Sequence, residues 1–207
     1  MDNIDDNYFT IKTTSEIEIK IKGSKFFGRA FPCKSEAEAE SALTLIRKKY
    51  FDATHHCFAY RIGLGPETKF RYSDAGEPSG TAGKPIYDQI LGQNLTNVLV
   101  VVTRYFGGTK LGTGGLTHAY SDSAAESINR AGIIEQFLTE QLLLFVEFHD
   151  YNIVERLIHK FQGKIVARGA AEQIPSITAE IRCSFIPEFK SRATESTSGR
   201  VRFGNVD

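Results

Sequence analysis

Hydrophobic residues are most concentrated just before a glycine-rich stretch near the middle of the chain. The consecutive apolar residues 98–102 predict a strand that is buried on both faces. This run stops before Arg104, and glycines are frequent from there to Gly115. From Leu116 onward apolar side chains recur every three or four residues, which predicts a helix that Gly132 ends. The sequence therefore predicts a strand, a glycine-rich loop and a helix in direct succession.

Alternation of apolar and polar residues predicts further strands in the first part of the chain. Residues 16–22 alternate without a break, which is typical of a strand with one buried face. Gly23 indicates a turn, and residues 25–33 then form the returning strand of a hairpin. Two more strands are expected at 54–64 and 69–72.

Two more helices are expected in this region. Ser35 is followed by Glu38 three residues later, a capping box that predicts the start of a helix. Pro85 suits the first turn of a short helix at 86–91, because proline lacks the N–H that this position leaves unpaired.

After Ile133 the pattern restarts and predicts a second domain. In chain order we expect a strand at 142–148, a helix that ends at Gly163, strands at 164–171 and 177–185, a helix from Pro187 and a strand at 201–203. The order β-α-β-β-α-β is that of a ferredoxin-like unit, in which two helices cover one face of an antiparallel sheet. We therefore predict an α+β protein with domains at residues 1–135 and 136–207.

Composition and charge are those of an ordinary globular protein. The 207 residues include 25 Lys and Arg and 25 Asp and Glu, so the net charge is zero. A nucleic-acid partner would need a local basic patch. No apolar run approaches the roughly 20 residues of a membrane span, and the acidic start is unlike a secretory signal. We expect a cytoplasmic protein without a membrane partner.

The cysteines and histidines give no support for a metal site. Cys33, Cys57 and Cys183 are far apart in the sequence and form no CxxC pair, so buried free thiols are expected. His55 and His56 are adjacent in an expected strand and point to opposite faces. We interpret them as ordinary strand residues, with one of them at the rim of the glycine-rich loop as the alternative. No metal or other cofactor is predicted.

The glycine-rich loop is a candidate anion-binding site. Glycines let the backbone approach a ligand closely, and a helix N-terminus directs unpaired N–H groups toward it. The spacing matches neither a Walker loop nor a dinucleotide fingerprint, and tight turning with close packing is an equally good explanation of the glycines. The candidate residues are Arg104, Tyr105, Gly107, Gly108, Lys110, Gly112, Gly114 and Gly115.

A second loop, at residues 73–85, is too rich in glycine and proline to form a helix or strand. Polar ordered loops of this kind often carry function. The candidate residues in and beside it are Tyr72, Asp74, Glu77, Ser79, Thr81 and Lys84. Asp74 and Glu77 could act as acid and base or hold a metal, but spacing within a loop fixes no geometry. We therefore assign no catalytic residue.

Both loops carry a family resemblance. The runs TRYFGGTKLGTGGL and YSDAGEPSGTAGKPI resemble the two signature blocks of the IMPACT/YigZ family, in its bacterial two-domain form. The resemblance implies a two-layer N-terminal domain similar to the second domain of a small-subunit ribosomal protein. It implies a C-terminal domain similar to the last domain of a translocating elongation factor. Eukaryotic members of the family regulate translation through a protein partner.

We interpret the chain as a non-enzymatic, translation-associated regulatory factor. It would bind RNA, the ribosome or a translation-related protein, with charged groups and glycine amides on phosphate. The alternative is an enzyme that binds phosphate or a nucleotide at the same loop and uses Asp74 or Glu77. A hydrolase or peptidase has little support, since HExxH and GxSxG motifs are absent.

Overall fold

The chain forms two compact units, which are described separately. The computed structural model describes residues 6–171 and 174–204. The N-terminal unit comprises Tyr8–Gln136, and the C-terminal unit comprises the chain from Phe137 onward together with Asp6 and Asn7. The predicted division, 1–135 and 136–207, differs in that Asp6 and Asn7 associate with the second unit.

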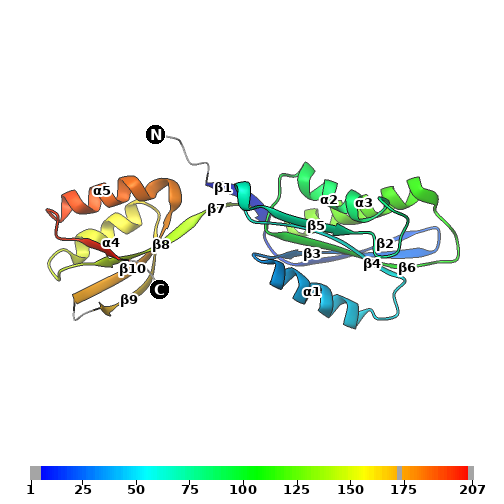
Figure 1. The fold of residues 1–207 in the computed structure, drawn as a ribbon, viewed down its shortest axis with the longest axis horizontal. Helices are drawn as coiled ribbons and strands as arrows, with labels where there is room; N and C mark the ends of the chain where they lie inside the picture. Colours follow the sequence, from blue (N-terminus) through cyan, green and yellow to red (C-terminus); the bar gives the residue numbers. More distant parts are fainter. Residues whose placement is uncertain (1–5, 172–173, 205–207) are drawn as a thin grey trace. The chain divides into compact units, whose positions relative to one another are not determined.

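The N-terminal unit is built on a five-stranded antiparallel sheet in the order β2-β3-β6-β4-β5 (Figure 1). The strands are β2 (Ser15–Ile21), β3 (Ser24–Pro32), β4 (His55–Ile62), β5 (Lys69–Ser73) and β6 (Val98–Tyr105). The run of apolar residues therefore forms the central strand, as its pattern predicted. Two short strands that the sequence pattern did not predict, β1 (Asn7–Ile11) and β7 (Ile133–Phe137), pair with each other.

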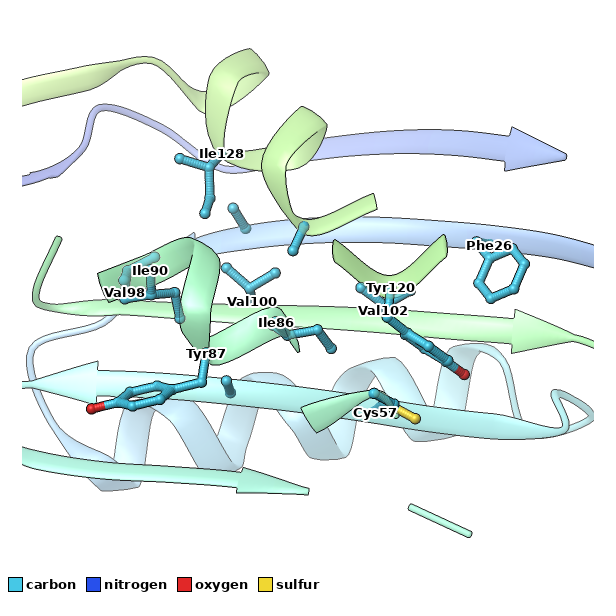
Figure 2. Packing of buried hydrophobic residues seen from close by; sticks show 14 of the residues in the cluster. Phe26, Cys57, Ile86, Tyr87, Ile90, Val98, Val100, Val102, Tyr120 and Ile128 are labelled. Carbon is cyan, nitrogen blue, oxygen red and sulfur yellow. The ribbon is translucent and has the colours of Figure 1, made fainter. Parts of the chain in front are cut away.

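Helices cover both faces of this sheet (Figure 1). The helices are α1 (Glu36–Lys49), α2 (Gly83–Gly92) and α3 (Gly112–Ala131). On one face α2 and α3 bury Ile86, Ile90 and Tyr120 against the sheet, as Figure 2 shows. On the other face α1 buries Leu43 and Ile46. The domain thus has three layers instead of the two expected.

The ends of the helices follow the predicted signals in part. The Ser35 hydroxyl accepts from the Glu38 N–H at 3.2 Å, which confirms the predicted cap of α1. The α2 helix begins at Gly83, before the expected start at Ile86. The α3 helix begins at Gly112, so the last glycines of the expected loop form its first turn.

The C-terminal unit has the predicted ferredoxin-like topology. Its antiparallel sheet has the order β11-β8-β10-β9. In chain order the elements are β8 (Thr139–Phe145), α4 (Tyr151–Lys160), β9 (Lys164–Ala171), β10 (Ile174–Arg182), α5 (Ile186–Ser196) and β11 (Arg202–Gly204). Both helices pack against one face of the sheet, where Val154 of α4 and Phe189 of α5 are fully buried.

Candidate functional site

The two glycine-rich loops meet at one pocket of the N-terminal unit. Its volume is about 350 Å³, and it lies between the end of β6 and the start of α3. The lining consists of Glu77, Pro78, Arg104, Phe106, Lys110, Leu111, Gly112, Thr113 and Leu116. Glu77, Arg104, Lys110 and Gly112 were among the residues singled out from the sequence, and the fold brings them together.

Arg104 lies in the wall of this pocket and is almost completely buried. Only 5% of the residue is exposed. Its Nη1 donates to Glu77 Oε1 at 2.6 Å, and its Nη2 donates to Ser24 Oγ at 3.3 Å. The buried Nε has no hydrogen-bond partner among the described residues. A buried N–H without an acceptor costs free energy.

Glu77 neutralises Arg104 and is held firmly in place. Its side chain is 4% exposed, and Oε1 also accepts from the Tyr120 hydroxyl at 2.7 Å. Burial raises the pKa of Tyr120, so this hydroxyl stays protonated and donates. His55 Nε2 lies 3.8 Å from the same oxygen. The positive charge of Arg104 is therefore largely neutralised by Glu77 within the protein.

Asp74 has a structural role that the sequence did not reveal. Its carboxylate accepts the backbone N–H groups of Gly80, Ala82 and Gly83 at 2.8–2.9 Å. These bonds close the second loop and fix the start of α2. Asp74 and Glu77, which by sequence alone could have acted as acid and base or held a metal, each bind other partners.

The other candidate residues in and beside the second loop lie outside the lining of the pocket. Tyr72 stacks on Tyr87, with ring centroids 5.6 Å apart. The Thr81 hydroxyl donates to the Pro78 carbonyl at 2.7 Å, and Lys84 pairs with Asp88 on α2. Ser79 is exposed. The loop is thus mainly a support for Glu77.

Three of the candidate glycines are explained by the backbone itself. Gly107 lies against the turn between β2 and β3, where an added Cβ would meet Gly23 at 1.9 Å. Gly108 and Gly112 have φ values of +86° and +74°, a region that other residues rarely adopt. These glycines shape the connection between β6 and α3.

Gly114 is not explained in this way. Its φ is not in the positive region, and an added Cβ would meet nothing within 4 Å. Glycine is unfavourable in a helix, by about 1 kcal/mol relative to alanine. Its neighbour Gly115 has a nearby atom, the Leu111 Cβ at 3.1 Å. Space left open at a helix N-terminus is what the close approach of a ligand to the backbone requires.

The first turn of α3 presents N–H groups without a side-chain cap. The residue before the helix is Leu111, which makes no capping bond, and the described first turn contains no acidic residue. Lys110 precedes the helix, is exposed and lines the pocket. The helix dipole and the Lys110 ammonium both favour an anion here.

Tyr105 belongs to a neighbouring pocket, because successive residues of β6 point to opposite faces of the sheet. Its hydroxyl donates to Asp52 Oδ1 at 2.7 Å. Phe106 lines both this pocket and the first one.

Sequence reasoning missed several residues of the site. Ser24 and Tyr120 hold Arg104 and Glu77 in place, and Phe106, which is 46% exposed, lines the pocket although it was not among the candidate residues. Ser24 and Tyr120 are distant from the loops in sequence, so no local spacing could have identified them. For Phe106 a signal existed, since it directly follows the end of the apolar strand.

No metal-binding cluster of three His, Cys, Asp or Glu residues occurs within residues 6–171 and 174–204. Cys33, Cys57 and Cys183 are free thiols. Burial raises the pKa of Cys57 to about 12, which makes it a poor nucleophile. Among the helices of the described part, none combines the length and apolar character that a membrane crossing requires.

Comparisons with known proteins agree with the architecture of both units. The model of the Impact N-terminal domain matches residues 22–128. An IMPACT family member of Haemophilus influenzae is 33% identical over 94% of both chains. YvyE of Bacillus subtilis, another member, is 42% identical over 64% of this chain and 60% of its own length. A crystal structure described as a hypothetical protein superposes with a TM-score of 0.68 at 25% identity, covering 98% of both chains. The chain therefore belongs to the IMPACT family.

Proposed function

We propose that this protein is a non-enzymatic, translation-associated regulatory factor that binds RNA through the pocket at the start of α3. A phosphate would be held by the N–H groups of the first turn of α3 and by Lys110. The observation that carries this proposal is Gly114, a glycine that neither the backbone nor the packing requires. Arg104 also lines this pocket, and its buried Nε lacks a hydrogen-bond partner among the described residues.

Charge also favours a modest, local contact with phosphate. Because Glu77 neutralises Arg104, the exposed cation of the pocket lining is Lys110. One cation and a helix N-terminus suit a single phosphate group better than a long duplex backbone. A translation-related role is supported by membership of the family, whose eukaryotic members regulate translation. A ribosomal surface or a protein partner would use the same face.

The alternative, an enzyme that acts on a phosphate or a nucleotide, has less support. It needs a carboxylate that is free to hold a metal or to take a proton. Asp74 accepts three backbone N–H groups, and Glu77 is bound by Arg104 and Tyr120.

A pair of lysine variants tests the RNA proposal. Lys110→Gln should weaken the binding of a short single-stranded RNA and lower the slope of log K against log salt by about 0.7, the contribution of one phosphate contact. Lys84→Gln is the matched control, because Lys84 lies outside the pocket and pairs with Asp88. The measurement is fluorescence anisotropy between 50 and 300 mM salt. The thermal midpoint should stay unchanged, since Lys110 is exposed.

Equal salt slopes for the wild type and both variants would show that Lys110 contacts no phosphate. Binding of a single nucleotide that requires magnesium and does not depend on salt would instead favour the enzyme.

A further inference from the structure

A second pocket lies beside the phosphate site and shares Phe106 with it. Its volume is about 370 Å³. Aromatic rings form much of its lining, and Lys25 and Asp52 contribute charged groups. The rings are those of Phe27, Tyr50, Tyr105 and Phe106. All these residues belong to the N-terminal unit. The size is within the usual range of small-molecule pockets, roughly 300–1,000 Å³.

The rings are held in position before any ligand arrives. Phe27 stacks on Tyr50 with centroids 5.9 Å apart, and Tyr105 meets Phe27 edge-on at the same distance. The bond from Tyr105 to Asp52 fixes the tyrosine ring. Burial and Asp52 raise the pKa of Tyr105 to about 12, so the donor is permanent at neutral pH. A preorganised aromatic pocket binds a flat ligand at a lower ordering cost than a mobile one.

Cations of the protein already lie over one of these rings. Aromatic cages bind ammonium groups over their ring faces, but this protein places its own cations there. The Arg29 guanidinium lies 4.1 Å from the centroid of the Tyr50 ring, and the Lys49 ammonium lies 5.0 Å from it. Lys25 lines the pocket as well. Lys25 and Asp52 give the lining one charge of each sign, and Glu16 pairs with Arg29 and Lys49, so the pocket suits a neutral aromatic ligand.

We propose that this pocket holds one unpaired nucleobase of a single-stranded RNA whose phosphate occupies the neighbouring site at α3. The inference rests on the proposed function and specifies its ligand. Phe106 forms the wall between base and phosphate, and Arg104 lies 5.5 Å from the centroid of that ring. The Lys25 ammonium can donate to the edge of the base, and the Asp52 carboxylate can accept from it. A base inside a duplex is stacked and paired, so only an unpaired base fits.

The test uses short single-stranded RNAs that each lack one base, compared with the intact strand and with its duplex. Phe106→Leu removes the shared ring, and 46% exposure makes this change safe for folding. Phe70→Leu is the matched control, since Phe70 is also exposed on the same unit but stacks on Tyr87 outside the pocket. Binding is measured by fluorescence anisotropy at 50 mM salt.

The wild type and Phe70→Leu should lose affinity by about tenfold at one abasic position, the effect expected of a stacked base. Phe106→Leu should bind the intact strand as weakly as the wild type binds that abasic strand, with no further loss when the base is removed. The duplex should bind more weakly than the single strand.

Two outcomes would overturn the inference, and they are distinguishable. If RNA binds in a salt-dependent way but every abasic strand binds as well as the intact one, the base pocket is wrong and the phosphate site stands. If no strand binds at 50 mM salt, the base pocket and the RNA function are both wrong.

Discussion

At the scale of single residues, the charge of the pocket depends on Glu77. Its carboxylate receives the Arg104 guanidinium and the Tyr120 hydroxyl while only 4% of its side chain is exposed. A buried ion pair contributes little net stability compared with an apolar pair, but removal of one partner leaves an uncompensated charge. Glu77 is thus a positioning residue, and its substitution should lower both the stability of the fold and the affinity for a ligand.

We predict that Glu77→Gln lowers the free energy of unfolding by about 3 kcal/mol, because Arg104 would remain buried and charged without its counter-ion. Chemical denaturation measures this change. Glu67→Gln provides the control, since Glu67 is exposed on the surface of the same unit. A loss of equal size in both variants would mean that the buried pair carries no special cost.

At the scale of elements, the connection between β6 and α3 divides its glycines between two tasks. Gly107 allows the backbone to pass close to Gly23, which joins this connection to the hairpin of β2 and β3. Gly114 has open space around it and sits in the first turn of α3. The first glycine serves the fold, and we infer that the second serves the ligand.

Alanine substitutions should separate these tasks. Gly107→Ala should destabilise the protein by about 1–3 kcal/mol, because the new methyl group forces the neighbouring turn to move. Gly114→Ala should leave the stability unchanged or raise it by up to about 1 kcal/mol, while RNA binding weakens as the methyl group blocks approach to the N–H groups. Thermal denaturation and anisotropy give the two readouts. Equal RNA affinity of Gly114→Ala and the wild type would contradict the ligand role of Gly114.

At the scale of the whole molecule, Asp6 and Asn7 belong to the C-terminal unit. Asp6 accepts from Arg182 Nε at 2.6 Å and from the Ser184 N–H at 2.7 Å. Burial opposes the charge of Asp6, but the bonds from Ser184 and Arg182 outweigh it and hold the pKa of Asp6 below its usual value. The C-terminal unit is therefore assembled from two distant segments of sequence.

A pH prediction follows from the lowered pKa of Asp6. Its ionised form stabilises the C-terminal unit above the pKa of the unfolded chain, near 3.9, and this stability is lost as the pH falls through the lower folded value. Asp6→Asn should weaken amide protection in β8 and β10 at pH 7 and flatten the acid dependence. Hydrogen exchange measures this, with Asp122→Asn, an exposed position, as the control. Unchanged protection in Asp6→Asn would show that the contact is not needed.

The elements were largely predictable from the sequence because their signals are local. The alternating residues 16–22 predicted the strand β2, and the predicted cap at Ser35 marks the start of α1. The predicted number of layers in the N-terminal domain was wrong, although the sequence contained a pattern that indicates three. Residues 98–102 read as buried on both faces, which requires cover on both sides of the sheet, and α1 supplies the second cover.

The site was less predictable, because its contacts join residues that are distant in sequence. Arg104 meets Glu77 and Ser24 only after β3 and β6 pair and the second loop folds back. The role of Asp74 depends on the path of the loop, which spacing does not determine. The helical start at Gly112 was missed because glycine disfavours helix, while the packing of Leu116 and Tyr120 stabilises the helix beyond it.

The alternation of β6 has a consequence for evolution and engineering. Arg104 and Tyr105 are consecutive, and each supplies a different pocket. Insertion or deletion of one residue within β6 would turn every later side chain to the opposite face. Arg104 and Tyr105 would then point away from their present pockets, and any valine that follows the change would leave its core. Changes in the length of the chain should therefore not be tolerated inside this strand.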